Sequence, residues 1–271
     1  MNLLYCGNKK VFDGLMISLL SITKYCKKPL TVYVMTADLR ELNASFEPIT
    51  EEQTDYLEQM MKKVHAENRI HLIDCSQLFR EEFLLSPNIR TSYTPYTLLR
   101  LLADKAEQIP ERILYLDTDT VACKDISPVF DTDITEYEFA GVSDYLGKWF
   151  ISRSYINAGI LYLNMEKIRE TGLFLRTREL CKTKKMWFPD QTALNRLVRK
   201  KLFLPGIYNE QRRWHEDTVI QHFCKSIRWL PFFHTVNIKP WEVEKVWLVY
   251  KLHAHDAVLH EYLWRKALTG N

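Results

Sequence analysis

The sequence predicts an α/β protein of 271 residues, with a mainly parallel sheet covered by helices on both faces. Short apolar segments of strand length alternate with segments of helical periodicity, and no change in composition divides the chain. Hydrophobic residues make up 46% of the sequence, which is enough for one large core. We therefore expect a single domain over residues 1–271, with a C-terminal helical segment at about 241–271. Two packed lobes are the alternative.

The order of the elements follows from the spacing of apolar residues. Strands are predicted at 2–6, 30–35, 69–73, 112–116, 138–143, 156–163 and 218–224. Helices are predicted at 13–25, 50–66, 95–106, 166–184 with a break at 171–172, 190–199, 241–250 and 257–267. The helix at 50–66 has the clearest start, because Thr50 and Gln53 have the spacing of a capping box.

The composition argues against several classes of protein. The net charge is +3 with both signs interspersed, so a nucleic-acid partner is not expected. No apolar stretch reaches the length of a membrane span, and the N-terminus lacks the pattern of a signal peptide. The six cysteines are scattered and form no Cys-x-x-Cys pair, which argues against structural zinc. We expect reduced, mostly buried thiols in a cytoplasmic protein.

Glycine is scarce in this sequence. There are 8 glycines and none forms a Gly-x-Gly pair, so the Gly-rich loops of dinucleotide-binding and P-loop proteins are absent. If the protein binds a diphosphate, a metal ion and basic side chains must do what backbone amides do in those folds.

Two carboxylates follow the predicted strand at 112–116. Asp117 and Asp119 are two residues apart, so in an extended backbone both side chains point the same way. Such a pair suits Mg²⁺ or Mn²⁺, especially when a phosphate supplies further ligands, and open α/β sheets bind ligands at the carboxyl ends of strands. The alternative is a solvated turn, which we prefer for the second copy of the triplet at Asp131 and Asp133.

Four further segments combine polar residues with the ends of elements, and each also has a purely structural interpretation. Asn157-Ala158-Gly159 either lets a ligand approach the backbone or forms a β-bulge. Asp190 and Gln191 lie at a helix start, where Asp190 could be a cap. His222 is a ligand candidate on a strand or a hydrogen-bonded core residue. Lys239-Pro240-Trp241 could be a helix entry.

In their order along the chain, these segments resemble the retaining glycosyltransferases of family 8, the group of glycogenin and the bacterial lipopolysaccharide galactosyltransferases. The resemblance covers nearly the whole chain and rests on segments 114–119, 157–159, 190–195, 204–209, 222–223 and 239–241. It implies a GT-A fold, with a Rossmann-like, mainly parallel mixed sheet flanked by helices in one domain. It also implies a UDP-sugar donor and Mn²⁺, with Mg²⁺ as the alternative metal.

The resemblance also implies roles for individual residues. Asp117, Asp119 and His222 match the metal ligands, and Asp190 and Gln191 match the catalytic pair beside the anomeric carbon. The residues implied in donor binding are Cys6, Asn8, Arg100, Asp117, Thr118, Asp119, Asp144, Asn157, Ala158, Gly159 and Lys239.

The segment between His222 and Lys239 is longer than in most members of the family. Lys239 matches the lysine that binds the diphosphate, but Lys225 is a second candidate because it lies closer to His222 in the chain. We expect the apolar run at 229–233 to pack against the body of the protein and to bring Lys239 to the metal site.

The implied reaction moves a hexose, glucose or galactose, from a UDP-sugar to a hydroxyl of a glycan or another acceptor, with retention at the anomeric carbon. One alternative is a non-catalytic sugar-nucleotide-binding regulator or scaffold in glycan assembly. A second is a metal-dependent nucleotidyltransferase, for which residues 6–10 are a poor version of the required Gly-rich loop. Peripheral association with a membrane is compatible with the sequence.

Overall fold

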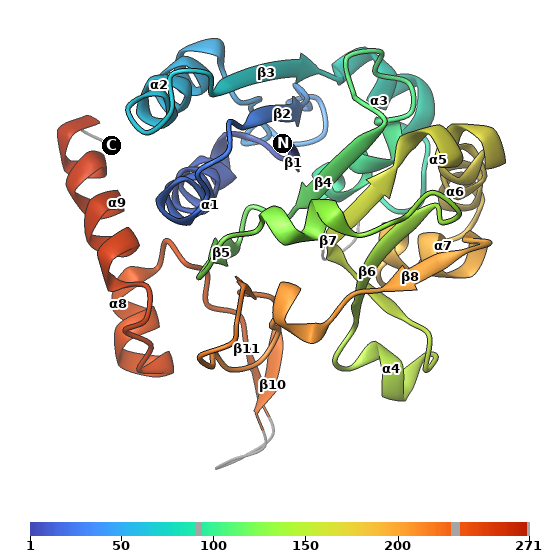
Figure 1. Cartoon of the computed structure of the whole chain (residues 1–271). Helices are drawn as coiled ribbons and strands as arrows, with labels where there is room; N and C mark the ends of the chain where they lie inside the picture. Colours follow the sequence, from blue (N-terminus) through green and yellow to red (C-terminus); the bar gives the residue numbers. More distant parts are fainter. Residues whose placement is uncertain (90–93, 229–233, 270–271) are drawn as a thin grey trace.

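A seven-stranded sheet runs through the molecule in the order β3-β2-β1-β4-β7-β6-β8 (Figure 1). β1 pairs in parallel with β2 and β4, β2 pairs in parallel with β3, and β6 with β8, whereas β7 runs antiparallel to β4 and β6. The sheet is mixed and mainly parallel, as predicted. Its strands are β1 (Asn2–Cys6), β2 (Thr31–Thr36), β3 (Arg69–Asp74), β4 (Arg112–Leu116), β6 (Phe139–Ser143), β7 (Ile156–Asn164) and β8 (Lys201–Phe203).

The computed structural model describes residues 1–89, 94–228 and 234–269. Within these ranges two small antiparallel sheets accompany the large one. They are formed by β5 (Thr120–Ala122) with β9 (Ile220–His222), and by β10 (Ser226–Arg228) with β11 (His234–Val236). The apolar run at 229–233, for which we expected packing against the body, lies outside the described residues.

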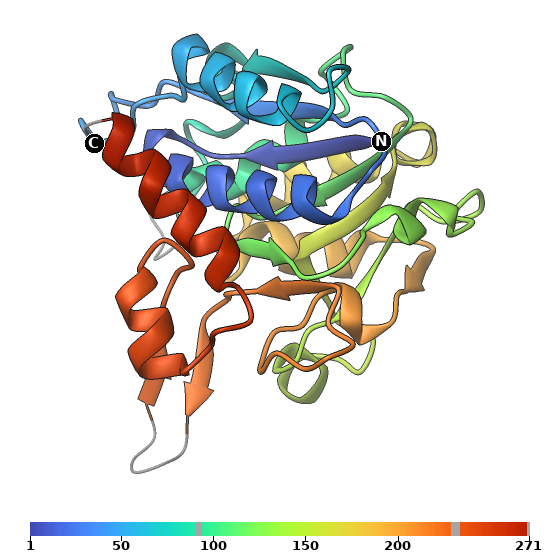
Figure 2. The same ribbon diagram turned by 60° about the vertical axis from the view of Figure 1, so that its left-hand side comes forward.

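Helices cover both faces of the central sheet. One face carries α1 (Phe12–Tyr25), α2 (Glu51–Lys62) and α9 (Asp256–Thr269), and Figure 2 shows α9 packed across α1. The other face carries α3 (Ser76–Phe83), η2 (Pro95–Leu102), α5 (Met165–Thr171), α6 (Leu173–Thr183) and α7 (Pro189–Leu197). The shorter elements are η1 (Lys9–Val11), η3 (Ser127–Asp131), α4 (Gly147–Phe150), η4 (Gly206–Tyr208), α8 (Val243–Lys245) and the π-helical turn η5 (Val246–Tyr250).

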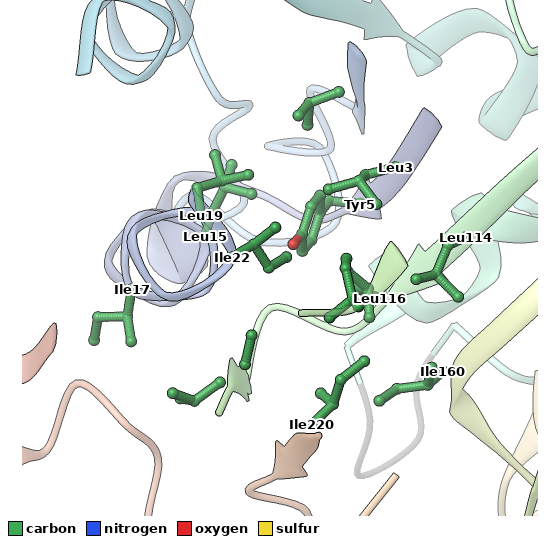
Figure 3. Packing of buried hydrophobic residues seen from close by; sticks show 14 of the residues in the cluster. Leu3, Tyr5, Leu15, Ile17, Leu19, Ile22, Leu114, Leu116, Ile160 and Ile220 are labelled. Carbon is green, nitrogen blue, oxygen red and sulfur yellow. The ribbon is translucent and has the colours of Figure 1, made fainter. Parts of the chain in front are cut away.

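The core lies in two layers, one on each face of the sheet. Along β1, Leu3 and Tyr5 belong to the layer under α1, whereas Leu4 belongs to the opposite layer, because successive side chains of a strand point to opposite faces. Figure 3 shows the first layer, in which Leu15 and Leu19 of α1 pack with the apolar side chains of β1 and β4. Strand β1 is therefore buried on both sides, which is why its sequence is continuously apolar.

Most long elements lie within a few residues of their predicted ranges. The capping box at Thr50 and Gln53 is formed, and the break between α5 and α6 is at Gly172, whose φ of 65° favours glycine. Residues 95–102 form a 3-10 helix instead of an α-helix reaching 106. All but one of these residues are buried, so packing on several sides overrides helix propensity.

The prediction was wrong or incomplete where elements are short. Residues 241–250, expected as one helix, contain only α8 and the turn η5, which ends at Lys251 in the left-handed region with φ 51°. The elements α3, α4, β5 and β8 were not predicted. They have three to eight residues each, which is too short for a periodic pattern to emerge.

The structure also bears on the thiols and on membrane insertion. All six cysteines are free, and four of them are buried. Burial raises the pKa of every one of these thiols. None of the helices in the described ranges has both the length and the apolar character needed to cross a bilayer.

A buried histidine makes the fold sensitive to acid. His255 is 3% exposed, its Nε2 atom has no hydrogen-bond partner among the described residues, and burial lowers its pKa from 6.5 to about 4. The unfolded chain therefore binds a proton near pH 6.5, but the folded chain binds it only near pH 4. Stability is lost as the pH falls through this window.

We predict that replacing this histidine flattens the acid side of the stability curve. Between pH 7 and 4, the wild type loses up to about 3 kcal/mol more unfolding free energy than His255→Leu, because leucine takes up no proton. Urea unfolding at pH 7, 5 and 4 measures the difference. Parallel pH dependence of the two proteins would show that His255 is not buried in its neutral form.

Candidate active site

Three potential metal ligands meet at the carboxyl end of β4. Asp117 and Asp119 follow this strand directly, and the pairing of Thr120 in β5 with His222 in β9 brings the imidazole beside them. His222 Nε2 lies 3.2 Å from Asp119 Oδ1 and 3.7 Å from Asp117 Oδ2. The three ligating groups lie within 4.8 Å of one another, although about 100 residues separate the aspartates from His222.

The chemistry of these groups fits a divalent cation. Two carboxylate oxygens and one imidazole nitrogen converge, which is a donor set that suits Mn²⁺ and also accommodates Mg²⁺. The carboxylate of Asp117 is held in one orientation. Its Oδ1 accepts hydrogen bonds from Tyr115 Oη at 2.6 Å and from Arg100 Nη2 at 3.0 Å, so Oδ2 is directed toward His222. By contrast, Asp131 and Asp133 are both exposed and lie around a turn, as expected.

Lys239 places a positive charge at the edge of this cluster. Its Nζ atom lies 2.5 Å from Asp119 Oδ2 and donates to the carbonyl of Phe223 at 3.1 Å. Burial opposes the ionisation of Asp119, but Lys239 and His222 outweigh it and hold the pKa of Asp119 well below its usual range. Burial would lower the pKa of Lys239, but Asp119 raises it. Lys225, the other candidate, is exposed.

The loop that carries the aspartates rests on the start of α1. A Cβ atom added to Gly14 would lie 2.6 Å from the carbonyl oxygen of Thr118 and 2.5 Å from the indole ring of Trp241. Only glycine allows this approach, so α1, the Asp117–Asp119 loop and the segment around Trp241 pack in direct contact. The tryptophan after Lys239 thus helps to hold the lysine near the cluster. It does not start a helix, since α8 begins at Val243.

Asn157-Ala158-Gly159 at the start of β7 lies at a β-bulge and packs against His222. The pairing of β6 with β7 shifts register between Gly141 and Ser143, opposite this segment. A Cβ atom at Gly159 would lie 2.2 Å from His222 Cε1, so the missing side chain makes room for the imidazole. The β-bulge interpretation of the segment is therefore confirmed, and the approach of a ligand to its backbone stays a prediction.

Arg100 joins Asp190 to the candidate metal site, which we call the metal cluster and which consists of the side chains of Asp117, Asp119 and His222. The guanidinium is 4% exposed, its Nε lies 3.2 Å from Asp190 Oδ2, and it stacks over Tyr115 at 4.1 Å from the ring centroid. Its Nη1 also donates to the carbonyl of Ala158. Burial opposes the charge of Arg100, yet the surrounding acidic groups raise its pKa. Burial raises the pKa of Asp190 against the pull of Arg100.

Asp190 is not a helix cap. The N-cap residue of α7 is Phe188, and no side chain caps the helix there. Gln191, the next residue, donates from Nε2 to Asp144 Oδ2 at 3.2 Å and accepts at Oε1 from the amide of Ala158 at 2.8 Å. Both ends of this side-chain amide are therefore engaged within the protein.

Asp144 ties the polar groups beside Gln191 together. Its Oδ2 also accepts from Asn157 Nδ2 at 2.9 Å, while Oδ1 accepts from the backbone amides of residues 146 and 147 at the start of α4.

The residues at the end of β1 are also buried. Cys6 is 9% exposed and Asn8 is 4% exposed, and Asn8 lies beside the hydroxyl of Tyr96.

Comparison with known proteins identifies the family. The model of glycosyl transferase family 8 matches residues 2–244. This chain belongs to glycosyl transferase family 8. The lipopolysaccharide 1,2-glucosyltransferase of Escherichia coli is 24% identical over 280 residues, covering 92% of this chain and 74% of that protein. A probable glycosyl transferase, Gly, of Streptococcus gordonii is 28% identical over 151 residues, which are 54% of this chain.

A solved structure supports the same fold. The galactosyltransferase LgtC in complex with donor and acceptor sugar analogs superposes with a TM-score of 0.68 at 15% identity, covering 96% of both chains. This family 8 chain therefore has the GT-A fold. It spans 22% of the length of the Streptococcus gordonii relative and 16% of the glycosyltransferase GlyA of Streptococcus pneumoniae.

Two residues of the family 8 site had no role in the sequence prediction. Tyr115 donates to Asp117, and Asn209 Oδ1 lies 3.1 Å from His222 Nδ1. The position of Tyr115 could have been inferred, since residues two apart on a strand point the same way. Asn209 belongs to the segment 204–209 that supported the family resemblance, but its contact with His222 depends on how η4 packs along β9.

We predict that Gly159→Ala disrupts the metal cluster. The added methyl group overlaps the imidazole ring, so His222 must move, at a cost of about 1–3 kcal/mol in stability. If these groups bind a divalent cation, displacement of the imidazole Nε2 should weaken Mn²⁺ binding by about tenfold. Gly206→Ala is the matched control, because nothing lies within 4 Å of a Cβ atom there. Equal Mn²⁺ affinity of the two variants in a titration would contradict the steric explanation.

Proposed function

We propose that this family 8 protein transfers a hexose, glucose or galactose, from a UDP-sugar to a hydroxyl of a glycan or another acceptor, with retention at the anomeric carbon and with Mn²⁺ bound. The observation that carries the proposal is the convergence of Asp117, Asp119 and His222 beside Lys239. Relatives named as lipopolysaccharide glucosyltransferase and galactosyltransferase support a hexose and a glycan acceptor.

The leaving group determines what the site must supply. Departure of UDP leaves negative charge on the diphosphate, and a divalent metal bound by Asp117, Asp119 and His222 would act there as a Lewis acid. Lys239 adds a fixed ammonium at the same place, where it stabilises the charge as it grows. Neutralisation of the diphosphate charge by side chains and a metal is consistent with the absence of Gly-rich phosphate-binding loops from the sequence.

Retention by a double displacement would require a protein nucleophile near the anomeric carbon. Gln191 is a poor nucleophile, and its Oε1 accepts a hydrogen bond from Ala158. The carboxylate of Asp190 is 6% exposed and paired with Arg100. We therefore favour attack by the acceptor hydroxyl on the same face that UDP leaves, within a short-lived ion pair. In this mechanism Asp190 orients the sugar or stabilises its positive charge.

The remaining assignments concern the donor and its surroundings. Asn157, Ala158 and Gly159 would contact the hexose, with Asp144 and Arg100 fixing their positions. Cys6 and Asn8, at the end of β1, would lie beside the nucleotide. The six free thiols support a cytoplasmic location for the described part of the chain.

Transfer of the sugar is tested by release of UDP. Incubation with UDP-glucose or UDP-galactose, Mn²⁺ and a panel of sugar acceptors should release UDP and yield a glycosylated product with the anomeric configuration of the donor. Binding of UDP-sugar without any turnover would favour a regulator or scaffold. Formation of pyrophosphate from UTP and a sugar phosphate would favour a nucleotidyltransferase.

Substitution of the paired aspartates tests the metal site. Asp117→Ala and Asp119→Ala should each lower the rate of UDP release by at least about a hundredfold with the fold intact, because each removes a ligand near the leaving group. Asp131→Ala and Asp133→Ala are matched controls in the exposed copy of the triplet and should change the rate by less than about twofold. Loss of activity in the second pair instead of the first would relocate the site.

The two lysines can be separated in the same way. Lys239→Ala should reduce donor affinity and turnover together, by at least about tenfold in kcat/KM, because the ammonium meets charge that grows in the transition state. Lys225→Ala removes an exposed side chain and should have less than about a twofold effect. A larger loss in Lys225→Ala, measured by steady-state kinetics, would assign the diphosphate contact to Lys225.

A further inference from the structure

Asn209 lies between the metal cluster and the residues beside the donor sugar. Asn209 is 2% exposed and follows η4. The next residue, Glu210, is held beside β9 by two backbone hydrogen bonds of 2.9 Å, in which Glu210 N donates to Ile220 O and His222 N donates to Glu210 O. Its side chain contacts His222 Nδ1 at 3.1 Å on one side and Asn157 Oδ1 at 3.0 Å on the other.

The orientation of the Asn209 amide follows from its neighbours. The backbone amide of Gly159 donates to Asn157 at 2.9 Å, and the other side-chain atom of Asn157 lies 2.9 Å from Asp144 Oδ2. An N–H can only donate and a carboxylate oxygen accepts, so Asn157 directs Oδ1 toward Gly159 and Nδ2 toward Asp144. Because Asn157 Oδ1 is an acceptor, Asn209 must direct Nδ2 toward it.

This orientation decides the tautomer of His222. With Nδ2 of Asn209 facing Asn157, its Oδ1 faces His222 and accepts the proton carried by Nδ1. The lone pair of the imidazole is then on Nε2, which is the atom directed toward Asp117 and Asp119. Metal-bound histidines commonly donate their second N–H to an oxygen in this way, and the partner fixes ring orientation and tautomer.

We propose that Asn209 is a positioning residue with two functions, one through each end of its amide. Its oxygen holds His222 in the tautomer that binds the metal, and its nitrogen holds Asn157 in the orientation required beside the hexose. Asn209 acts through these two residues. The proposal rests on the proposed function, and it adds a direct link between the metal and the donor sugar within the protein.

Two substitutions separate the two functions. Asn209→Ala removes both contacts, so it should weaken Mn²⁺ binding in the presence of UDP by about tenfold. Asn209→Asp keeps an acceptor for His222 but has no donor for Asn157, so Mn²⁺ affinity should stay within about threefold of wild type. The same variant should bind UDP-hexose about tenfold more weakly relative to UDP, because a carboxylate oxygen then faces Asn157 Oδ1 in place of a donor and repels it.

A buried amide elsewhere in the chain provides the structural control. Asn68 is 1% exposed, accepts from Leu30 N and donates to Met61 O, so Asn68→Ala also removes one contact at each end of an amide. It should lower the melting temperature but leave Mn²⁺ affinity unchanged. His222→Ala provides the reference for complete loss of the imidazole ligand.

Free Mn²⁺ measured by electron paramagnetic resonance, with UDP or UDP-hexose present, distinguishes the outcomes. If both Asn209 variants bind Mn²⁺ equally well, or if Asn68→Ala weakens binding as much as Asn209→Ala, the positioning function is disproved. If Asn209→Ala does not fold, the near-isosteric Asn209→Asp still tests the second function, and an unchanged preference for UDP-hexose overturns the proposal. Failure of the wild type to bind Mn²⁺ with UDP would instead contradict the proposed function.

Discussion

A buried positive charge organises the candidate site of this family 8 protein. Arg100 contacts Asp117 after β4, Asp190 in α7 and the carbonyl of Ala158 in β7. Removing one partner from a buried ion pair costs about 3–5 kcal/mol, so these three elements cannot separate without leaving charge unpaired. Arg100 and Tyr115 also share one oxygen of Asp117, which directs the other toward His222.

The site is built where segments distant in the chain approach more closely than ordinary side chains allow. Gly14 admits the carbonyl of Thr118 and the ring of Trp241, and Gly159 admits the imidazole of His222. Two of the 8 glycines thus serve close packing around the metal cluster. This close packing explains how a site without a Gly-rich loop still depends on glycine: the residue creates space for side chains and loops that approach the ligands, and does not itself cradle a phosphate.

Polar groups around the cluster form one connected network. From Asp119 the contacts pass through His222 and Asn209 to Asn157, and from there through Asp144 to Gln191. Few of these atoms can exchange their hydrogen-bond partner for another, because they are buried and an unsatisfied buried polar group lowers the stability of the fold. A network of this kind keeps each donor and acceptor in one orientation. Such preorganisation is what a reaction that develops charge requires of its active site.

The sequence by itself determined the local features. Short apolar runs and helical patterns located the sheet and the long helices, and the spacing of Asp117 and Asp119 after an apolar strand indicated a metal pair at a strand end. These patterns depend only on residues close together in the chain, so they can be recognised without knowledge of the fold. The family resemblance named His222 and Lys239 as partners of this pair, but only the tertiary structure decided how they and Asn209 face it. His222, Lys239 and Asn209 reach it through the β5–β9 pairing and the packing of Trp241 on α1, which depend on contacts between residues about 100 to 200 positions apart in the chain.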